Sequence, residues 1–232
     1  MTSIAAAGGS SHWRGSVQVW GQRYQAAPSD PETALHYARA LRASGLNAQA
    51  VAVLEQAVLQ NPGHRGALAA YGRALADRGH YKRALEVLER AHDPGQPDWR
   101  ILSVQGAALD QLGRHEDAQR YYGTALRIAP DEPSVLSNLG LSYALSKDLV
   151  RAEATLRRAA GQSRVDSMAR RNLALVVGLQ GRLSEAEGIA RGDLPPDAAA
   201  VNVADLRRLL AQQNGWKQSG RDNEPAVGAQ GS

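Results

Sequence analysis

Small and apolar residues recur along this chain at a fixed interval of 34 residues. The most regular register is alanine, at Ala50, Ala84, Ala118, Ala152 and Ala186. Within one interval, Leu102, Gly106 and Leu109 share the face of a first helix, and Tyr122 and Ala125 lie with Ala118 on the face of a second. Self-similarity at one period over most of a chain predicts a stack of small units, each of them a pair of amphipathic helices.

Glycine holds a second register, at Gly72, Gly106 and Gly140. A glycine inside a helix costs about 0.5–1 kcal/mol relative to alanine, so its recurrence predicts a close approach of two helices, whose axes lie about 8–10 Å apart when packed. A large residue recurs as well, at Leu54, Leu88, Tyr122 and Leu156, and supplies one bulky side chain per unit. A second glycine register is Gly45, Gly79, Gly113 and Gly181, with Lys147 at the remaining position.

Proline and helix-capping residues divide the chain into repeats. Pro28, Pro62 and Pro130 recur where a second helix should stop, because proline cannot continue a helix. Asp30 followed by Pro31 is typical of a helix N-terminus. We predict a disordered segment at 1–11, a half-repeat at 12–30, repeats at about 31–64, 65–98, 99–132, 133–166 and 167–196, a capping helix at 197–213 and a disordered tail at 214–232.

Both ends of the stack are predicted to carry caps, because an open end of a solenoid exposes its core. Trp20 lies one period before Leu54, so the half-repeat corresponds to a second helix whose partner is missing. At the other end the predicted capping helix is amphipathic, with apolar residues at Val201, Leu206, Leu209 and Leu210.

The combined pattern resembles the tetratricopeptide repeat family. One repeat of this chain matches the family's positions with Leu102, Gly106, Ala118, Ala125 and Pro130. The chain contains no Phe, and Leu or Tyr stands in its place, while Pro97 comes one position late. The resemblance implies an all-α fold, a right-handed solenoid of antiparallel helix pairs with N- and C-terminal capping helices.

The amino-acid composition excludes several kinds of site and function. The chain of 232 residues has no Cys, which excludes disulfides, thiol catalysis and thiolate metal sites. Its net charge of +4 comes from Arg interspersed with Glu and Asp, which predicts a mildly basic surface rather than a nucleic-acid-binding arm. No apolar stretch is long enough for a membrane span.

Residues suited to catalysis do not gather into a motif. The histidines, His12, His36, His64, His80, His92 and His115, lack metal-ligand spacing, and several are expected as solvent-exposed turn residues. The carboxylates are expected to form solvated pairs with arginines on the outer helices; they include Glu55, Glu86, Glu89, Glu116, Asp117, Glu153 and Glu185. We therefore predict that the protein is not an enzyme and needs no metal or cofactor.

A stripe of first-helix positions beside the packing face is predicted to line a concave groove. Its predicted binding residues are Arg39, Arg73, Arg100, Ser103, Asn138, Leu141, Arg171 and Leu175. Two interpretations stay open: scattered solvated arginines, or a trough for an acidic or C-terminal peptide segment. The clamp with which some tetratricopeptide proteins hold a chaperone's acidic tail is not matched, since only Asn138 falls in place.

Four stretches carry a closer resemblance: 133–145, 171–181, the Asp-Leu-Pro-Pro of 193–196 and the Leu-Leu-Ala-Gln-Gln-Asn-Gly-Trp of 209–216. Together they resemble the tetratricopeptide component of the Tad (tight adherence, Flp pilus) assembly machinery. The resemblance implies a non-enzymatic accessory of pilus assembly that helps the outer-membrane secretin to assemble or localise. Its partners would be the secretin or other Tad components, with no nucleic acid.

The resemblance also implies a periplasmic, outer-membrane-associated protein, typically lipidated on a Cys. The sequence as written starts without a signal peptide and has no Cys, which predicts a cytoplasmic protein. The alternative function is a cytoplasmic scaffold or co-chaperone that uses the same groove on other peptides. The bound peptide and the oligomeric state stay open.

Overall fold

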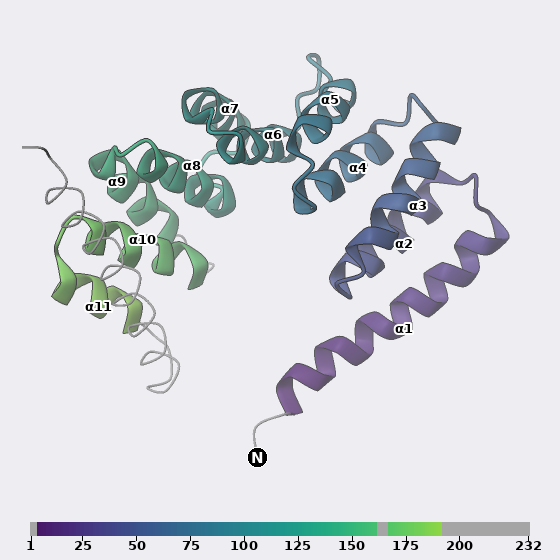
Figure 1. Ribbon diagram of the computed structural model, residues 1–232, viewed down its shortest axis with the longest axis horizontal. Coiled ribbons are helices and arrows are strands. Elements are labelled where there is room, and N and C mark those ends of the chain that lie inside the picture. The colour runs from purple at the N-terminus through teal and green to yellow at the C-terminus, as the bar shows by residue number, and fades with distance from the viewer. Residues whose placement is uncertain (1–3, 162–166, 192–232) are drawn as a thin grey trace, which may run out of the picture. The chain divides into compact units, whose positions relative to one another are not determined.

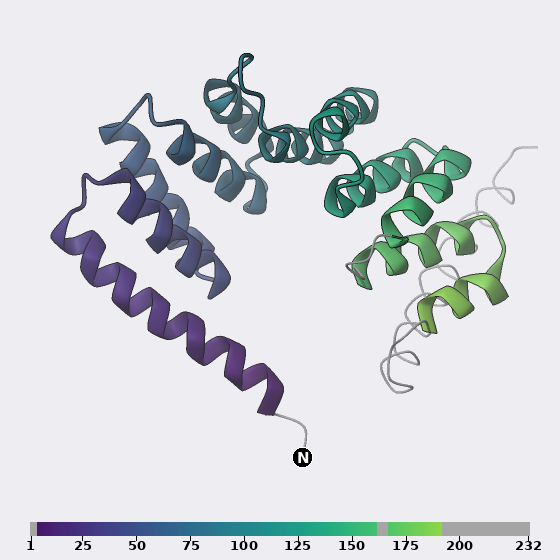
Figure 2. The same ribbon diagram turned by 180° about the vertical axis from the view of Figure 1, so that it is seen from behind.

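A computed structural model describes residues 4–161 and 167–191 of the chain (Figures 1 and 2). All regular elements in these two ranges are α-helices. In chain order they are α1 (Ile4–Ala26), α2 (Pro31–Ala43), α3 (Asn47–Gln60), α4 (Arg65–Asp77), α5 (Tyr81–Ala91), α6 (Trp99–Gln111), α7 (His115–Ile128), α8 (Pro133–Leu145), α9 (Leu149–Ala160), α10 (Ser167–Leu179) and α11 (Leu183–Arg191).

The helices from α2 onward form pairs at the period seen in the sequence. The first helices of the pairs begin at Pro31, Arg65, Trp99, Pro133 and Ser167, each 34 residues after the one before. Each first helix packs against the helix that follows it, across a turn of three residues. The predicted all-α fold of tetratricopeptide helix pairs is confirmed.

The N-terminal helix starts earlier than the sequence pattern predicts. Helix α1 begins at Ile4, whereas we predicted disorder over 1–11 and a helix from His12. Ala5, Ala6 and Ala7 follow its first residue, and alanine has the highest helix propensity of all residues, which offsets the glycines after it. The predicted capping helix at 197–213 and the tail at 214–232 lie outside the described residues.

The chain divides into two compact units, Met1–Pro130 and Asp131–Ser232. In the first unit α1 packs on α2, and α2, α4 and α6 contact one another in turn as neighbouring first helices. In the second unit α10 contacts α8, α9 and α11. Each unit is therefore built by the same neighbour-to-neighbour packing, with its own buried core of Ala, Leu and Val.

The glycine register marks the closest approach of paired helices. A methyl group on Gly72 would lie 2.5 Å from Cγ of Leu88, and one on Gly140 would lie 2.5 Å from Cγ of Leu156. In the intervening repeat, a methyl group on Gly106 would lie 2.6 Å from Cε1 of Tyr122. The bulky residue of each second helix thus fills the space that the glycine leaves open, and all three of these large side chains are at most 1% exposed.

The second glycine register lies in the turns that follow the first helix of each pair. Gly45, Gly79, Gly113 and Gly181 have φ between +75° and +86°, a left-handed conformation that glycine adopts without steric cost. Lys147 takes the same conformation with φ +67°. Its backbone N–H donates to the carbonyl of Ala144 at 3.0 Å, and the next N–H donates to Tyr143 at 2.9 Å. The turn is the same as in the other repeats, although a side chain disfavours it.

Helix α1 covers the exposed side of α2 with aromatic contacts. The ring of Trp20 stacks on that of His36, with centroids 4.2 Å apart and planes 13° from parallel. Arg23 also lies over the same indole, 4.7 Å from its centroid. Tyr24 packs beside Tyr37 at 5.5 Å between centroids. These contacts let a single helix close the first unit without a partner helix of its own.

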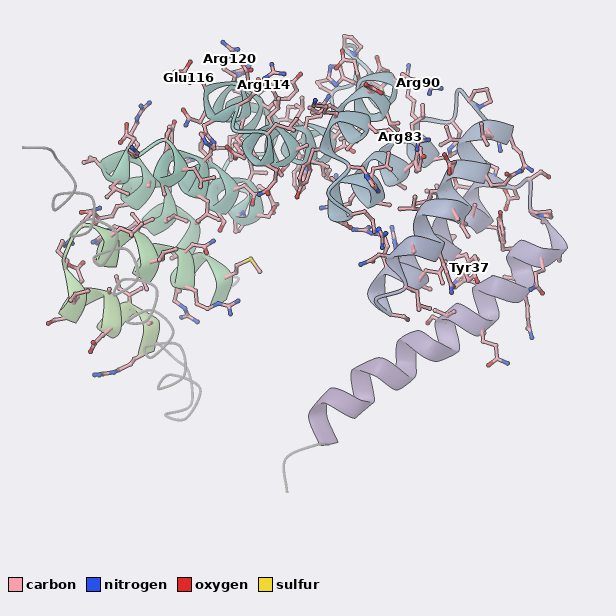
Figure 3. All side chains as sticks on the ribbon, viewed as in Figure 1. Tyr37, Arg83, Arg90, Arg114, Glu116 and Arg120 are labelled. Carbon is pink, nitrogen blue, oxygen red and sulfur yellow. The ribbon has the colours of Figure 1, made fainter. Side chains whose placement is uncertain are left out.

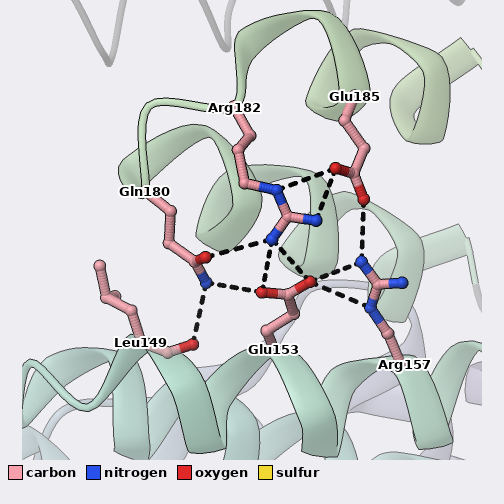
Figure 4. A network of polar contacts seen from close by, with 6 residues as sticks. All are labelled: Leu149, Glu153, Arg157, Gln180, Arg182 and Glu185. Carbon is pink, nitrogen blue, oxygen red and sulfur yellow. Dashed lines mark hydrogen bonds and ion pairs between the residues drawn. The ribbon is translucent and has the colours of Figure 1, made fainter.

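Glu153 joins the last two described repeats through a network of charged hydrogen bonds (Figure 4). On α9 it accepts from Arg157 of its own helix and from Arg182 of the following repeat, at 2.5 and 2.8 Å. Gln180 donates to it as well, at 2.8 Å, and Glu185 closes the network with both arginines. The Glu153 side chain is only 15% exposed, so this carboxylate is not the solvated group that the sequence pattern predicted.

Burial and hydrogen bonding act on the pKa of Glu153 in opposite directions. Burial raises the pKa because it disfavours the charged form, but the hydrogen bonds from Arg182, Gln180 and Arg157 outweigh it and lower the pKa to about 2. The carboxylate is therefore ionised throughout the neutral range and stabilises the contact between repeats.

A similar contact joins the first two repeats. Glu55 on α3 accepts a hydrogen bond from Tyr71 on α4 at 3.0 Å and pairs with Arg83 on α5 at 2.5 Å. Burial, and then the hydrogen bond and charge of Glu55, raise the pKa of Tyr71 to about 12. In the next repeat Gln105 takes the position of Tyr71, and its amide reaches Glu89 at 3.4 Å. Its Oε1 atom is buried without a hydrogen-bond partner among the described residues.

Candidate functional site

A groove of about 400 Å³ lies in the first unit, along its first helices. Its walls come from α2, α4 and α6, with Leu54 of α3 and Leu88 of α5 reaching its floor. The lining residues are Glu32, Leu35, His36, Ala38, Arg39, Arg42, Leu54, Gly66, Ala69, Ala70, Arg73, Leu88, Asp98, Arg100, Ile101 and Val104. Leu88 is also the side chain that packs against Gly72, so the groove opens onto the contact between paired helices.

Polar and apolar lining residues fall into two rows. Leu35 of α2 and Ala69 of α4 occupy equivalent positions and form an apolar row, which Val104 of α6 continues from one position further along its helix. Arg39 and Arg73 follow one helical turn later on α2 and α4 and form a basic row. Four residues of α-helix rise by about 6 Å, so the two rows run side by side at roughly that separation.

Most of the charged side chains around the groove are neutralised by neighbours. Arg42 donates to Asp77 of the next repeat through Nε at 2.9 Å. Arg100 lies 3.6 Å from Asp98 and stacks over the ring of Trp99, 4.5 Å from its centroid. These contacts hold both guanidinium groups at the rim of the groove.

The carboxylate of Glu32 also has a partner. His64 lies with Nε2 3.3 Å from its carboxylate, while Nδ1 accepts the backbone N–H of Ala67 at 3.1 Å and caps α4. A ring nitrogen that accepts carries no proton, so this histidine acts as a structural cap at the edge of the groove. His115, which was expected as an exposed turn residue, likewise has a partner, with Nδ1 2.9 Å from Asp110.

Arg39 and Arg73 differ from their neighbours. Both side chains are exposed, and neither forms a hydrogen bond or an ion pair with any residue in 4–161 or 167–191. Desolvation in the groove, and then the positive charges of Arg42 and Arg100, lower the pKa of Arg73, against the opposite effect of Asp77. The groove therefore holds positive charge that the first unit itself does not neutralise.

The structure brings three of the predicted binding residues together. Arg39, Arg73 and Arg100 line one groove, whereas Ser103 is buried, with 8% of its surface exposed, and does not line it. On α6 the residue that lines the groove is Val104, one position further along the helix. The periodic stripe used for the prediction missed Val104, His36 and Ala70, which adjoin it on their helices.

The other predicted residues lie in the second unit. Asn138 and Leu141 belong to α8, and Arg171 and Leu175 belong to α10. The two helices contact each other, and Asn172 donates to the hydroxyl of Ser137 at 3.0 Å between them. Arg171 is exposed, while Leu141 and Leu175 are half-buried. A binding role for these four residues stays a prediction.

The outer helices carry a different kind of charge. Arg114, Glu116 and Arg120 project from the outer side of α7, where Asp117 pairs with both arginines (Figure 3). Arg83 of α5 pairs with Glu55. Ion pairs in such solvated positions contribute little to stability.

Two family models described as tetratricopeptide repeat match the chain, over residues 41–107 and 104–167. Together they span more than half of its length. The chain belongs to the tetratricopeptide repeat family. Proteins of this family bind protein partners and are generally non-enzymatic scaffolds.

Similar proteins agree with this assignment. The uncharacterised protein y4yS of Sinorhizobium fredii (strain NBRC 101917 / NGR234) is 34% identical over 106 residues, which are 46% of this chain and 58% of y4yS. The chain thus covers little more than half of that relative. TTC0263, a thermophilic TPR protein in Thermus thermophilus, is 26% identical with a TM-score of 0.64, over 79% of this chain and 98% of the other.

A third similar structure is PilW, a widely conserved type IV pilus biogenesis factor. Its TM-score is 0.72 at 17% identity, over 82% of this chain and 90% of PilW. At this identity the likeness shows a common fold. Among the helices that the structure describes, none is long and apolar enough to cross a membrane.

Proposed function

We propose that this protein is a non-enzymatic scaffold that binds an extended segment of a partner protein in the groove of its first unit. The observation that carries the proposal is the pair of unpartnered arginines, Arg39 and Arg73, beside an apolar row on contacting helices. Uncompensated guanidinium groups next to exposed apolar surface suit a protein ligand, which supplies both carboxylates and apolar side chains.

We further propose that the scaffold serves the assembly of a Tad pilus, as an accessory that helps the secretin to assemble or localise. The support is the sequence resemblance of residues 133–145, which form α8, and 171–181, which cover the end of α10 and the start of the turn after it. The resembling stretches at 193–196 and 209–216 lie outside the described residues. The likeness to PilW contributes the fold alone.

Blocking the groove tests both parts. Ala69 is half-buried and lines the groove, so Ala69→Trp should fill space that a ligand would occupy. Ala52→Trp, on the exposed side of α3, adds the same side chain outside the groove and is the matched control. Helicity and the melting temperature of both variants are measured first.

The functional readouts are copurification of the secretin from cells and the number of pili per cell. We expect Ala69→Trp to lose both while Ala52→Trp retains them. Retention of copurification by a folded Ala69→Trp variant would refute the groove as the binding site. Failure of the unmodified protein to copurify any Tad component, with normal piliation of a deletion strain, would refute the pilus role.

A further inference from the structure

The groove's two rows specify a pattern for its ligand. We infer that the groove binds an extended peptide in which two acidic residues alternate with apolar ones, the acids facing Arg39 and Arg73 and the apolar side chains facing Leu35, Ala69 and Val104. This inference rests on the proposed function, since it names the chemistry of the partner segment at the same site.

The alternation follows from the geometry of an extended chain. Successive side chains of such a chain point to opposite sides, and those two residues apart point to the same side at about 6.6–7 Å. The basic and apolar rows both run across the helices, parallel to each other, so a chain lying between them would present alternate side chains to each row. Uniformly acidic segments would leave the apolar row uncovered, and uniformly apolar ones would leave the arginines unpaired.

The number of acidic residues follows from the sequence of the three helices. Position 39 of α2 and position 73 of α4 are Arg, but the equivalent position of α6 is Ala107. Arg100 does not replace it, because its guanidinium stacks on Trp99 near Asp98 at the other end of α6. The basic row therefore ends after two charges, and a third acidic residue in line would meet no cation.

A nucleic acid fits these features less well. Single strands bind through a run of positive charge along the backbone together with aromatic platforms for the bases. Here the unpaired charge is limited to two side chains, and the row beside it is aliphatic. The Trp20 ring is already in contact with His36 and Arg23. An extended acidic and apolar peptide uses both rows, which is why the observations favour it.

Synthetic peptides test the inference with the whole chain. The probe is a labelled, amidated Gly-Ser-Leu-Glu-Leu-Glu-Leu-Ser peptide, and its partner has Gln in place of Glu. Fluorescence anisotropy should show binding of the Glu peptide that weakens with added salt, and binding at least about tenfold weaker for the Gln peptide, because charge-assisted hydrogen bonds are lost. Wild-type protein that binds both peptides equally, or neither, overturns the inference.

Substitutions test which arginines bind the acidic residues of the peptide. Arg39→Gln and Arg73→Gln should each weaken binding of the Glu peptide by about tenfold or more and leave the Gln peptide unchanged. The matched control is Arg120→Gln with Arg127→Gln, which removes two exposed charges from α7. Unchanged affinity in the Arg39 and Arg73 variants, or an equal loss in the control, refutes the assignment.

Two further arms separate this inference from the proposed function. If Ala69→Trp abolishes peptide binding but the Arg39 and Arg73 variants do not, the groove is the binding site and the charge pattern is wrong. If Ala69→Trp leaves binding intact, the proposed function itself fails at this site. Tighter binding of a single-stranded oligouridine than of the Glu peptide overturns the inference in favour of a nucleic acid.

Discussion

Replacing Gly106 with alanine should destabilise the first unit, although alanine is the better helix former. The new methyl carbon would lie 2.6, 2.8 and 3.0 Å from three ring carbons of Tyr122. Carbon atoms in favourable contact are about 3.5–4.0 Å apart, so the ring or the helix must move by roughly 0.5–1 Å. The ring has little freedom to do so, because Tyr122 is 1% exposed and its hydroxyl donates to Asp110 at 3.1 Å.

The magnitude follows from two opposing contributions. Overpacking of a core costs about 1–3 kcal/mol, while removing a glycine from a helix gains about 0.5–1 kcal/mol. We expect the free energy of unfolding to fall by about 1–2 kcal/mol. Gly123 on α7 is the matched control in the same repeat, since a methyl group there meets no atom within 4 Å. Gly123→Ala should raise stability by about 0.5–1 kcal/mol.

Urea unfolding followed by circular dichroism measures both changes by linear extrapolation. A double-mutant cycle with Tyr122→Ala isolates the contact, because Gly106→Ala should be neutral or stabilising once the ring is gone. The reasoning fails if Gly106→Ala is as stable as the parent protein. It also fails if the penalty persists unchanged in the Tyr122→Ala background.

Three other substitutions have expected outcomes. Lys147→Gly should raise the melting temperature and stabilise the second unit by about 1 kcal/mol, because Lys147 has φ +67° where the other repeats have glycine; a decrease in thermal unfolding would contradict this. Gln105→Leu should be neutral or stabilising by up to about 1 kcal/mol in urea, since it removes a buried oxygen without a partner among the described residues, and a clear loss would show that the contact with Glu89 matters more. Glu153→Gln should cost about 1–2 kcal/mol at neutral pH. Because the folded-state pKa of Glu153 is lowered to about 2 from 4.5, its contribution is fully present above pH 4.5 and disappears as the pH falls through 2. The stability difference between parent and variant should shrink over that window, and a difference independent of pH would count against the ionised network.

The period of small residues predicted the fold because it reports a repeated packing requirement. Gly72, Gly106 and Gly140 each face a large residue of the partner helix, and such a contact leaves its mark in both members of the pair. The start of α1 was not predictable in the same way. It depends on the helix propensity of a short alanine run rather than on packing against a repeat.

The sequence predicted which arginines share the groove side of their helices, but not which of them are paired with a carboxylate. Helical periodicity placed Arg39 and Arg73 on the same side of their helices. Which arginine finds a carboxylate depends on contacts between repeats, such as that of Arg42 with Asp77, 35 residues away. The same limitation hid the roles of Glu55 and Glu153, which pair with Arg83 and Arg182, 28 and 29 residues away along the chain.

Two tryptophans stand next to the groove without lining it. Trp20 stacks on His36, a residue of the α2 wall, and Trp99 lies beneath Arg100, a residue of the α6 wall. Any ligand that displaces or contacts either of these lining side chains changes the surroundings of an indole ring. Binding of a ligand in the groove can therefore be followed by the intrinsic tryptophan fluorescence of the unmodified protein.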